Sequence, residues 1–507
     1  MTDTTGGGLS VAIIGAGFGG IAMGVRLVKA GITNFTIFDS WGDIGGTWLH
    51  NTYPGAAVDT PSHMYSFSFR RYDWPRRFAT QAELLEYLKT TVKEWGLDEH
   101  LELNTEITGV HWDDRSRTHR VVDANGCEWT FNVVVSAVGI LNVPAFPGWE
   151  GKDEFRGTVL HTARWDPAVD WSGKRVAVVG TGSSSAQVVP AMAPDAASLT
   201  VFMRQPVWVD EKDEHTFTRE ERRRYSTWWG YHRERYKVYL ANERNWLGGR
   251  VAVPGSRVDR RATARCFAHM KRQIKDPALL RLMTPDGPYM AKRPVRSAEY
   301  LPALQRDNVK LVPRAVERFY EDGLIDSAGE KHPVDIVVTA TGFRPAEYIF
   351  GIDVTGSNGA DLHGVWGADP QAFLGVNYPG FPNFFMLLGP NSNYYAIVFN
   401  LERQADFVAR ILVRMQRSGS DVAEVKHTYF RVFNRWLSKR LARSSFATGE
   451  SYFRSASGTV VTQWPEGAAP FWLLTRLLAI PSTRFTAARV RPARRPQTTN
   501  TRQSPQA

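Results

Sequence analysis

The chain has 507 residues, of which 43% are hydrophobic and 22% charged, an ordinary globular composition that excludes disorder of the chain as a whole. At roughly 100–200 residues per domain, this length predicts two to four domains. The only cysteines, Cys127 and Cys266, lie 139 residues apart, which excludes a disulfide framework, a multi-cysteine metal site and a CxxC redox pair. No metal site is expected.

The formal net charge of +11 is concentrated in two segments. Residues 218–275 contain sixteen Lys and Arg against five Asp and Glu, and residues 481–507 contain six Arg and no acid. These segments carry +11 and +6, so the rest of the chain carries about −6. The sequence has no apolar run of 18 residues and begins without a basic and apolar secretory signal, so we expect a cytoplasmic protein with no integral membrane segment.

The N-terminal segment predicts a nucleotide-binding βαβ unit. A short β-branched run is followed by Gly15, Gly17 and Gly20 in the spacing G-x-G-x-x-G, by a helical pattern, and by an apolar run at 35–38 that ends at Asp39. The glycines let the backbone approach a pyrophosphate at the helix N-terminus. A carboxylate at position 39 accepts a hydrogen bond from a ribose 2′-hydroxyl and repels a 2′-phosphate. This unit is therefore predicted to bind FAD or NAD and to disfavour NADP.

The following residues lead to a second copy of the same plan. Residues 81–95 predict an amphipathic helix, and residues 131–139 predict a buried strand. Residues 174–204 then repeat the order strand, small-residue turn, helix and strand. The strand-end sequence NVVVSAVG at 132–139 also recurs, as DIVVTATG at 335–342. The chain therefore contains two dinucleotide-binding units.

The second glycine turn differs from the first in one decisive charge. Gly180 and Gly182 are followed by Ser185 where a third glycine is usual, and Arg204 occupies the position equivalent to Asp39. A guanidinium binds a 2′-phosphate through paired hydrogen bonds, so this copy is predicted to bind NADPH. One flavin site and one hydride-donor site predict a flavoprotein that is reduced by NADPH.

These patterns predict an α/β fold with two Rossmann-like dinucleotide-binding domains, for FAD and for NADP, and a helical insertion in the NADP domain. The predicted boundaries are 1–145 and 340–480 for the FAD domain, 146–209 and 290–339 for the NADP domain, 210–289 for the helical insertion, and 481–507 for a basic, disordered tail.

Two longer stretches carry more specific information. Residues 45–59 are GGTWLHNTYPGAAVD, and residues 155–166 are FRGTVLHTARWD. The first resembles the [A/G]-G-x-W-x4-[F/Y]-P-[G/M]-x3-D signature, and the second the F-x-G-x3-H-x3-W-[P/D] fingerprint, of type I (class B) flavin-dependent Baeyer–Villiger monooxygenases. Shorter similarities include MAKRP at 290–294 and ATGF at 340–343. The resemblance extends over about residues 10–475.

The resemblance implies a reaction and assigns roles to individual residues. In this family NADPH reduces FAD, O2 adds to the reduced flavin, and the resulting C4a-peroxyflavin attacks a ketone, which rearranges to an ester or lactone. By the resemblance, Arg293 is the catalytic arginine and Asp59 its partner carboxylate, Lys292 and Arg204 bind the 2′-phosphate of NADP, and His161 lies at the linker between the nucleotide domains. Arginine suits the first role because it keeps its proton at working pH beside developing negative charge.

The glycine turns and the resemblance together predict a set of site residues. The cofactor-binding residues are Gly15, Gly17, Gly20, Asp39, Gly46, Thr47, Trp48, Asp59, Gly180, Gly182, Ser183, Ser184, Arg204, Lys292, Thr341 and Gly342. The domain-linker fingerprint consists of Phe155, Gly157, His161 and Trp165. Trp48 is predicted to pack near the flavin, and packing within the core is the competing interpretation.

Three functions are compatible with the sequence. The first is oxidation of a small-molecule ketone by O2 and NADPH, and the second is oxidation of nitrogen or sulfur in a soft nucleophile by a related flavin monooxygenase. The third is a flavoprotein without oxygenase activity, tethered through its basic segments to nucleic acid or a membrane. Asp59 with Arg293 and the fingerprint at 155–166 favour the first. Aromatic residues at helical spacing with solvated cations explain the basic insertion, so no nucleic-acid partner is expected. The sequence determines neither the ketone nor the oligomeric state.

Overall fold

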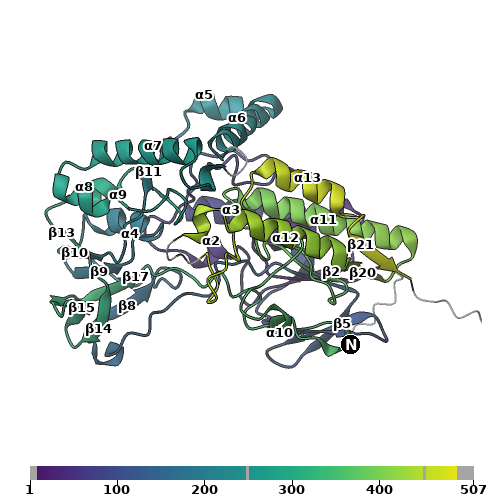
Figure 1. The fold of residues 1–507 in the computed structure, drawn as a ribbon. Helices are drawn as coiled ribbons and strands as arrows, with labels where there is room; N and C mark the ends of the chain where they lie inside the picture. Colours follow the sequence, from purple (N-terminus) through teal and green to yellow (C-terminus); the bar gives the residue numbers. More distant parts are fainter. Residues whose placement is uncertain (1–7, 247–249, 449–450, 452, 488–507) are drawn as a thin grey trace, which may run out of the picture.

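The computed structural model describes residues 8–487 except 247–249, 449–450 and 452. Two α/β lobes lie side by side, and a group of helices covers them at one end (Figure 1). Each lobe is built on a five-stranded sheet. Short 3-10 helices occupy Asp98–His100, Lys152–Glu154, Arg250–Ala252, Ser357–Gly359 and Ser445–Ala447.

The sheet of the first lobe combines strands from both ends of the chain. Its strands are β1 (Val11–Ile14), β2 (Phe35–Phe38), β3 (Leu101–Glu102), β7 (Val133–Ser136) and β19 (Phe384–Met386). Their order is β19-β7-β1-β2-β3, and all neighbours are parallel. Strands β1 and β7 are buried at every position, because valine and isoleucine fill both faces of a covered parallel sheet. This frame is the first dinucleotide-binding unit.

Helices cover this sheet, and a smaller sheet extends it. The helices are α1 (Phe18–Lys29), α2 (Thr47–His50), α3 (Gln81–Glu94) and α11 (Ile397–Ser418), whereas α10 (Leu362–Trp366) packs against the smaller sheet. The smaller sheet has the order β18-β4-β5-β6 and is formed by β4 (Ile107–Asp113), β5 (Thr118–Asp123), β6 (Glu128–Phe131) and β18 (Asp353–Thr355). Helix α3 begins at a capping box. The Thr80 hydroxyl accepts the Glu83 backbone N–H at 3.4 Å, and the Glu83 carboxylate accepts the Thr80 backbone N–H at 2.8 Å.

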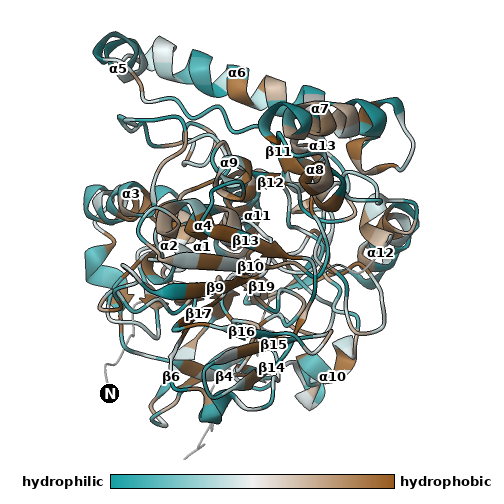
Figure 2. Cartoon of the chain, turned by 90° about the vertical axis from the view of Figure 1, so that its left-hand side faces the viewer, coloured by the Kyte–Doolittle hydropathy of each residue, from teal (hydrophilic) through white to brown (hydrophobic). Residues whose placement is uncertain are grey.

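The second lobe repeats the parallel plan. Its sheet has the order β13-β10-β9-β17-β8, with all neighbours parallel. The strands are β8 (Thr158–His161), β9 (Arg175–Val179), β10 (Ser198–Phe202), β13 (Val309–Val312) and β17 (Ile336–Thr339), and the helices are α4 (Ser185–Met192) and α9 (Tyr300–Ala303). Beside it lies an antiparallel sheet of β14 (Val316–Tyr320), β15 (Gly323–Asp326) and β16 (Lys331–Pro333). Figure 2 shows β9, β10, β13 and β17 as apolar strands inside this lobe.

The helical insertion interrupts the second lobe between two short parallel strands. These strands are β11 (Val209–Asp210) and β12 (Val295–Arg296), and the helices between them are α5 (Arg219–Ser226), α6 (Trp228–Trp246), α7 (Arg257–Gln273) and α8 (Pro277–Met283). Figure 2 shows α5 and α6 at the top of the molecule, with polar residues along much of their length. The predicted α/β fold with two Rossmann-like domains and a helical insertion is thereby confirmed.

The C-terminal part of the chain packs onto the first lobe through α12 (His427–Leu441) and α13 (Ala468–Leu478). Helix α13 lies against α11. Strand β20 (Val422–Val425) then pairs antiparallel with β21 (Thr483–Thr486). The predicted start of a disordered tail at residue 481 is therefore wrong, because Phe485 and its neighbours gain backbone partners on β20. Residues 488–507 of that predicted tail lie outside the described residues.

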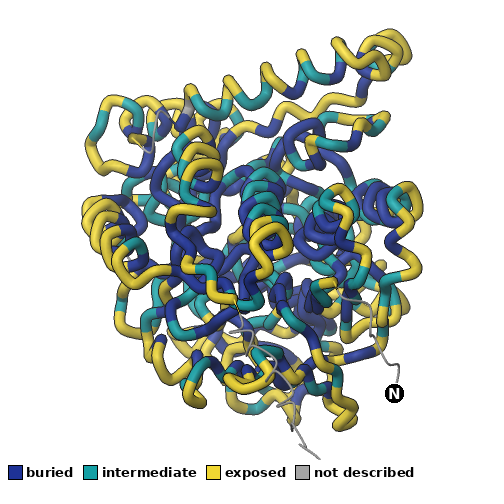
Figure 3. Tube along the Cα trace, turned by 90° about the vertical axis from the view of Figure 1, so that its right-hand side faces the viewer, coloured by how far each residue is buried: buried dark blue, intermediate teal, exposed yellow. Residues whose placement is uncertain are grey.

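Burial follows this architecture. Figure 3 shows a dark blue interior and concentrates the exposed, yellow tube on the outer helices and loops. Within the part of the chain that the structure describes, no helix combines the length and the apolar composition that crossing a membrane requires.

Candidate active site

The first glycine turn lies at the carboxyl edge of the first sheet and lines a pocket there. A Cβ on Gly15 would lie 2.7 Å from the carbonyl oxygen of Ala137, and a Cβ on Gly20 would lie 1.8 Å from that of Gly15. Neither position admits another residue without a shift of the backbone. Gly46 approaches the turn from the other side, since its Cβ would lie 3.1 Å from the Cα of Gly17. Two loops therefore present bare backbone to this pocket.

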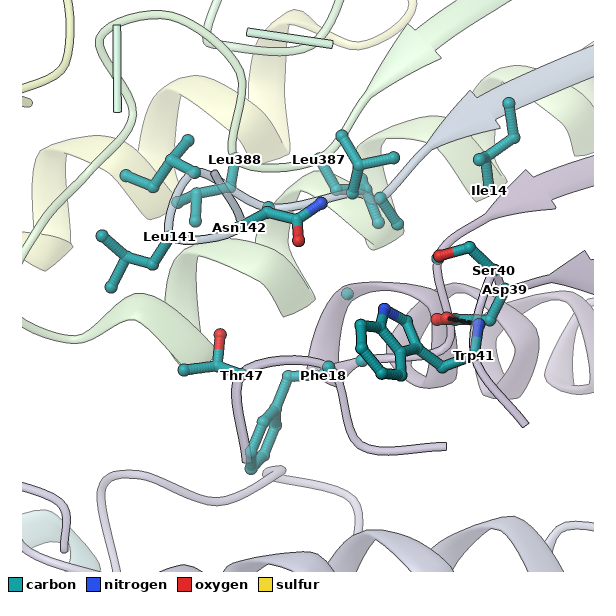
Figure 4. Close-up of a pocket in the computed structure, with 18 of the residues that line it drawn as sticks. Ile14, Phe18, Asp39, Ser40, Trp41, Thr47, Leu141, Asn142, Leu387 and Leu388 are labelled. Carbon is teal, nitrogen blue, oxygen red and sulfur yellow. Dashed lines mark hydrogen bonds between the residues drawn. The ribbon is translucent and has the colours of Figure 1, made fainter. Parts of the chain in front are cut away.

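Asp39 follows β2 and closes one end of the pocket. One of its carboxylate oxygens accepts the Ala16 N–H at 2.7 Å, and the other accepts the Trp41 N–H at 3.0 Å. Burial raises the pKa of Asp39, and these two hydrogen bonds oppose the rise. Figure 4 shows Asp39 and Trp41 at one end of the pocket and Thr47 toward the other. Six of the residues predicted to bind a nucleotide line this pocket, namely Gly15, Gly17, Asp39, Gly46, Thr47 and Trp48, whereas Gly20 and Asp59 lie outside its lining.

Trp48 combines a place in the pocket wall with packing in the hydrophobic core. Its side chain lines the pocket, and the residue is only 8% exposed. The indole N–H donates to the Tyr65 hydroxyl at 3.2 Å, and the two rings pack edge to face. Ile397 and Leu401, in the first turns of α11, line the same pocket. The positive end of the α11 dipole thus faces the pocket.

The second glycine turn follows β9 in the second lobe. Gly180 has a φ of +122°, and a Cβ there would lie 2.5 Å from the carbonyl oxygen of Ala340. Gly182 faces open space, whereas Ser183 and Ser184 are half-buried beside it. Ser185, which replaces the usual third glycine, is fully buried at the start of α4. The turn therefore keeps an open backbone surface despite this replacement.

The segments that carry two predicted phosphate-binding cations meet beside this turn. Arg204 is exposed just beyond β10. The ammonium group of Lys292 donates a hydrogen bond to the side chain of Gln205, the next residue along the chain. Lys292 therefore contacts the residue that follows Arg204, although the two cations are 88 residues apart in sequence.

The 45–59 stretch also joins the two lobes. The Tyr53 hydroxyl donates to the Gln187 side-chain oxygen of α4 at 2.8 Å, and the Gln187 amide donates to the Ala57 carbonyl at 2.8 Å. Gly55 has a φ of +80°, and its Cβ would lie 2.7 Å from the Gln187 carbonyl oxygen. A larger residue at position 55 would therefore separate the first lobe from α4.

Asp59 and Arg293 form an ion pair between the lobes. One guanidinium nitrogen, Nη2, donates to both Asp59 carboxylate oxygens, at 2.9 and 2.7 Å. The Asp59 side chain is 12% exposed and that of Arg293 is 30% exposed. Burial acts to raise the pKa of Asp59, but the positive charges of Arg293 and Arg296 outweigh it and hold that pKa below its usual value. The pair is therefore ionised at neutral pH and partly open to solvent.

A second charged group supports this pair. The Arg296 guanidinium donates to the Tyr395 hydroxyl, which itself donates to the Asp59 backbone carbonyl at 3.1 Å. Arg296 also lies 3.8 Å from the Asp210 carboxylate, which forms a closer ion pair with Arg265 at 2.9 Å. Asp59 is thus fixed through both its side chain and its backbone.

A cavity of about 490 Å³ opens beside the ion pair. Asp59 and Arg293 form part of its wall, and the insertion contributes residues from α6 and α7. Trp246, Tyr394 and Phe453 add aromatic surface. Charged and amide side chains share this wall with the aromatic surface. A space of this size is typical of a small-molecule site.

The chain passes between the lobes near residue 144 and again near residue 343, and these two segments pair with each other. Pro144 and Phe343 form an antiparallel bridge, and the Ala145 N–H donates to the Gly342 carbonyl at 2.9 Å. The Thr341 hydroxyl donates to the Ala145 carbonyl at 2.6 Å. Thr341 and Gly342, predicted as cofactor-binding residues, are thus placed in this crossing, outside the lining of the first pocket.

His161 lies at the same crossing. It is 3% exposed at the end of β8, and its Nδ1 accepts the Ala163 N–H at 3.0 Å. Its Nε2 lies 3.4 Å from the Thr341 hydroxyl, and its ring packs on Phe146. Burial lowers the pKa of His161 to about 4, and nearby Arg164 adds to this effect. The imidazole is therefore neutral at pH 7.

The other residues of the fingerprint pack within the second lobe. Phe155 packs on Phe319 in a small hydrophobic cluster. A Cβ on Gly157 would lie 2.3 Å from the Asp335 carbonyl oxygen and equally close to the Phe155 ring. Trp165 packs edge to face on Trp171. These residues position β8, whose last residue is the linker histidine.

Comparison with known proteins fits this geometry. A family model described as pyridine nucleotide-disulphide oxidoreductase matches residues 12–222, which include both glycine turns. A Baeyer–Villiger monooxygenase from Pseudomonas aeruginosa is 37% identical over 479 residues, which cover 92% of this chain and 89% of that protein. This chain belongs to the Baeyer–Villiger monooxygenase family.

Two further comparisons cover this Baeyer–Villiger monooxygenase almost completely. An FAD-binding monooxygenase from Aspergillus niger, ktnD, is 31% identical over 482 residues, which cover 90% of this chain and 78% of that protein. The crystal structure of cyclohexanone monooxygenase from Rhodococcus sp. Phi1 bound to NADP+ superimposes with a TM-score of 0.84 at 27% identity, covering 95% of this chain and 99% of that one. Cys127 and Cys266 are both free thiols, so the match to disulphide oxidoreductases reflects the nucleotide-binding frame and not disulfide chemistry.

Several residues of this Baeyer–Villiger monooxygenase site were absent from the sequence prediction. Gln187, Arg296 and Tyr395 contact the predicted segments through side-chain hydrogen bonds. None of them occupies a position in the recognised motifs. For Arg296 the sequence did carry a signal, because this second cation lies three residues after Arg293, the predicted partner of Asp59. Gln187 and Tyr395 depend on contacts between distant segments that no spacing indicates.

Proposed function

We propose that this Baeyer–Villiger monooxygenase binds FAD in the first lobe and NADPH in the second, and inserts one oxygen atom from O2 next to the carbonyl of a small-molecule ketone to give an ester or lactone. The observation that carries this proposal is the Asp59–Arg293 ion pair, which lies between the two nucleotide-binding lobes and in the wall of a cavity. The relatives' FAD and NADP+ support the cofactor assignment.

The residues of the first pocket fit a flavin dinucleotide. The Gly15–Gly20 turn and Gly46 leave backbone open to a pyrophosphate. Asp39 retains lone pairs for a ribose hydroxyl, because each of its oxygens accepts one backbone hydrogen bond, from Ala16 and from Trp41. The N-terminus of α11 adds a positive dipole end toward the pocket, which suits a ring system that gains negative charge on reduction.

The second turn fits NADPH. Gly182 leaves room for a pyrophosphate beside the N-terminus of α4, and Arg204 with Lys292 supplies positive charge for a 2′-phosphate. The contrast with Asp39 in the first lobe supports the division of the two cofactors. Bound there, NADPH supplies hydride, and the flavin supplies the two-electron chemistry that activates O2.

Arg293 and Asp59 would act by holding charge in place. A guanidinium keeps its proton at working pH, so Arg293 presents a fixed positive charge where negative charge develops on oxygen during attack on a ketone. Asp59 orients this guanidinium through two hydrogen bonds from one nitrogen. Tyr395 and Arg296 in turn fix the Asp59 backbone. The arrangement is preorganised, so little reorganisation is needed when charge appears.

The test is a substrate panel with purified protein, FAD and NADPH. Linear, cyclic and aryl ketones form one arm, and amines and sulfides form the other, with products identified by mass spectrometry. Ester or lactone products from at least one ketone class are expected. Sulfoxides or N-oxides as the only products would contradict the proposal and support the oxidation of soft nucleophiles. NADPH oxidation that yields only hydrogen peroxide with every compound would contradict oxygenase activity.

A further inference from the structure

The cavity beside the Asp59–Arg293 pair has an unusual charge distribution. Five of its lining residues are arginines, namely Arg244, Arg261, Arg265, Arg293 and Arg296, whereas Asp59 is its one lining carboxylate among the described residues. Arginine is expensive to place without a counter-charge in a hollow of low dielectric constant. The partners of these arginines therefore matter.

Three of the five arginines have carboxylate partners. Arg293 pairs with Asp59 at 2.7 Å, and Arg265 and Arg296 share Asp210, at 2.9 and 3.8 Å. The positive charges of these three arginines are therefore largely compensated by the two aspartates. Asp210 itself is buried and also accepts a hydrogen bond from the Tyr289 hydroxyl, so its negative charge is compensated by groups of the protein.

The other two arginines are different. Arg244 lies near the C-terminal end of α6, and Arg261 lies in the first half of α7. Both are exposed residues that line the cavity, and neither forms an ion pair with any residue that the structure describes. Two different helices thus direct uncompensated guanidinium groups to the same space. A concave, partly apolar wall concentrates the field of such charges and attracts anions.

The rest of the wall limits what such an anion is attached to. Trp246, Val258, Met290 and Phe453 contribute apolar and aromatic surface to the same wall. A bare inorganic anion would leave this surface in contact with water. A molecule with an apolar body and an anionic end uses both features, since guanidinium groups bind carboxylates and phosphates through paired hydrogen bonds.

We infer that the ketone oxidised by this enzyme carries an anionic oxygen group, a carboxylate or a phosphate, which Arg244 and Arg261 bind while the carbonyl lies at the Asp59–Arg293 pair. This inference rests on the proposed function for its carbonyl end and deepens it by naming the substrate class. It also assigns a role to part of the basic insertion, whose cations otherwise form a solvated face.

The test uses matched neutral and anionic ketones. Levulinate and its longer-chain homologues are each compared with their methyl esters, and ketones bearing a phosphate monoester form a third arm that separates the two anion types. Because a charge-assisted hydrogen bond is stronger than a neutral one, we expect kcat/KM for the preferred anion to exceed that of its methyl ester by about tenfold. Added salt should reduce this preference, because it screens charges at an open site.

Variants locate the effect. The double variant Arg244→Gln, Arg261→Gln should lower the preference for the anion to about twofold, with the methyl ester oxidised as in the parent enzyme. Arg281→Gln is the matched control, since Arg281 is an exposed arginine of α8 that does not line the cavity. It should leave the preference unchanged. The KM for NADPH should be the same in all these proteins.

A binding measurement keeps this inference separate from the proposed function. The anionic ketone should raise the melting temperature of the FAD-loaded parent protein and of Arg281→Gln, but not that of the double variant. If no ketone is oxygenated yet this difference appears, the proposed function fails and the anion site stands. Equal use and equal binding of anion and ester by the parent protein would overturn the inference. A rise in the NADPH KM of the double variant with an unchanged anion preference would also overturn it, because the arginines would then serve the cofactor.

Discussion

Replacement of Arg293 by alanine tests the central claim about chemistry. The guanidinium donates two hydrogen bonds to Asp59 and lies in the cavity wall, yet the first pocket and the second glycine turn are built from other residues. We therefore expect Arg293→Ala to retain FAD and to be reduced by NADPH at a rate within a few-fold of the parent. Formation of oxygenated product should fall, because the fixed positive charge is lost.

The expected loss of activity in Arg293→Ala follows from the role assigned to the guanidinium. Loss of one preorganised donor at a developing oxyanion costs about 10²–10³-fold in kcat. The stability cost is smaller, about 1–3 kcal/mol, which is typical when a buried acceptor loses its partner. Arg296 still faces Asp59 and limits this cost. A pH series provides an independent check: with Arg293 present the pKa of Asp59 is lowered, so its stabilising contribution is present above the carboxyl's unfolded pKa and is lost as the pH falls through the folded value.

In Arg293→Ala the burial of Asp59 is expected to dominate and raise its pKa, so the difference in melting temperature between the two proteins should be larger at pH 7 than at pH 4. The assay combines anaerobic stopped-flow reduction of the flavin with product and peroxide measurement under O2. NADPH consumption should continue and yield hydrogen peroxide in place of ester. Arg293→Lys, which keeps the charge but not the planar fork, should retain intermediate activity. Product formation by Arg293→Ala within threefold of the parent would refute the role assigned to this residue.

Three further perturbations test other parts of the structure. Arg204→Ala should raise the KM for NADPH by about tenfold or more and leave that for NADH nearly unchanged, as expected for loss of a charged partner of the 2′-phosphate; equal changes in steady-state assays would contradict this role. Gly20→Ala should lower FAD occupancy and the melting temperature, because its Cβ would lie 1.8 Å from the Gly15 carbonyl oxygen; a variant that purifies with full flavin absorbance would show that the turn can shift. Because burial lowers the pKa of His161 to about 4, the unfolded chain binds its proton first, and stability should fall as the pH drops from about 6.5 toward 4. His161→Asn should make this fall shallower by about 1.4 kcal/mol per pH unit, measured by denaturant unfolding, and an unchanged slope would contradict a neutral buried histidine.

The nucleotide-binding frame was predictable because its signals are local. Gly15, Gly20 and Gly180 mark positions where the backbone must approach another backbone segment. The strands before these turns are apolar at nearly every position and lack the alternation of polar and apolar residues that a surface strand shows. Asp39 and Arg204 then differ in charge at equivalent positions. Each of these features depends on a residue and its sequence neighbours, so the sequence alone indicates two such units.

The boundary of the C-terminal tail was not predictable in the same way. An Arg- and Pro-rich composition indicated disorder from residue 481, but β21 pairs with β20 from 58 or more residues earlier. Backbone hydrogen bonds between distant strands carry no compositional signature. The same limitation applies to the basic insertion, where composition could not separate a solvated arginine from one in a cavity wall.

The sequence by itself determined which chemical groups this protein has: two nucleotide turns of opposite charge preference, an arginine and an aspartate in specific motifs, and no reactive cysteine pair. Only the tertiary structure decided which of these groups meet. Asp59 and Arg293 are 234 residues apart and join in one ion pair, Tyr395 and Arg296 fix that pair, and Arg244 and Arg261 reach the same cavity from separate helices. The physical reason is that a charge acts through distance in space, whereas a motif records only distance along the chain.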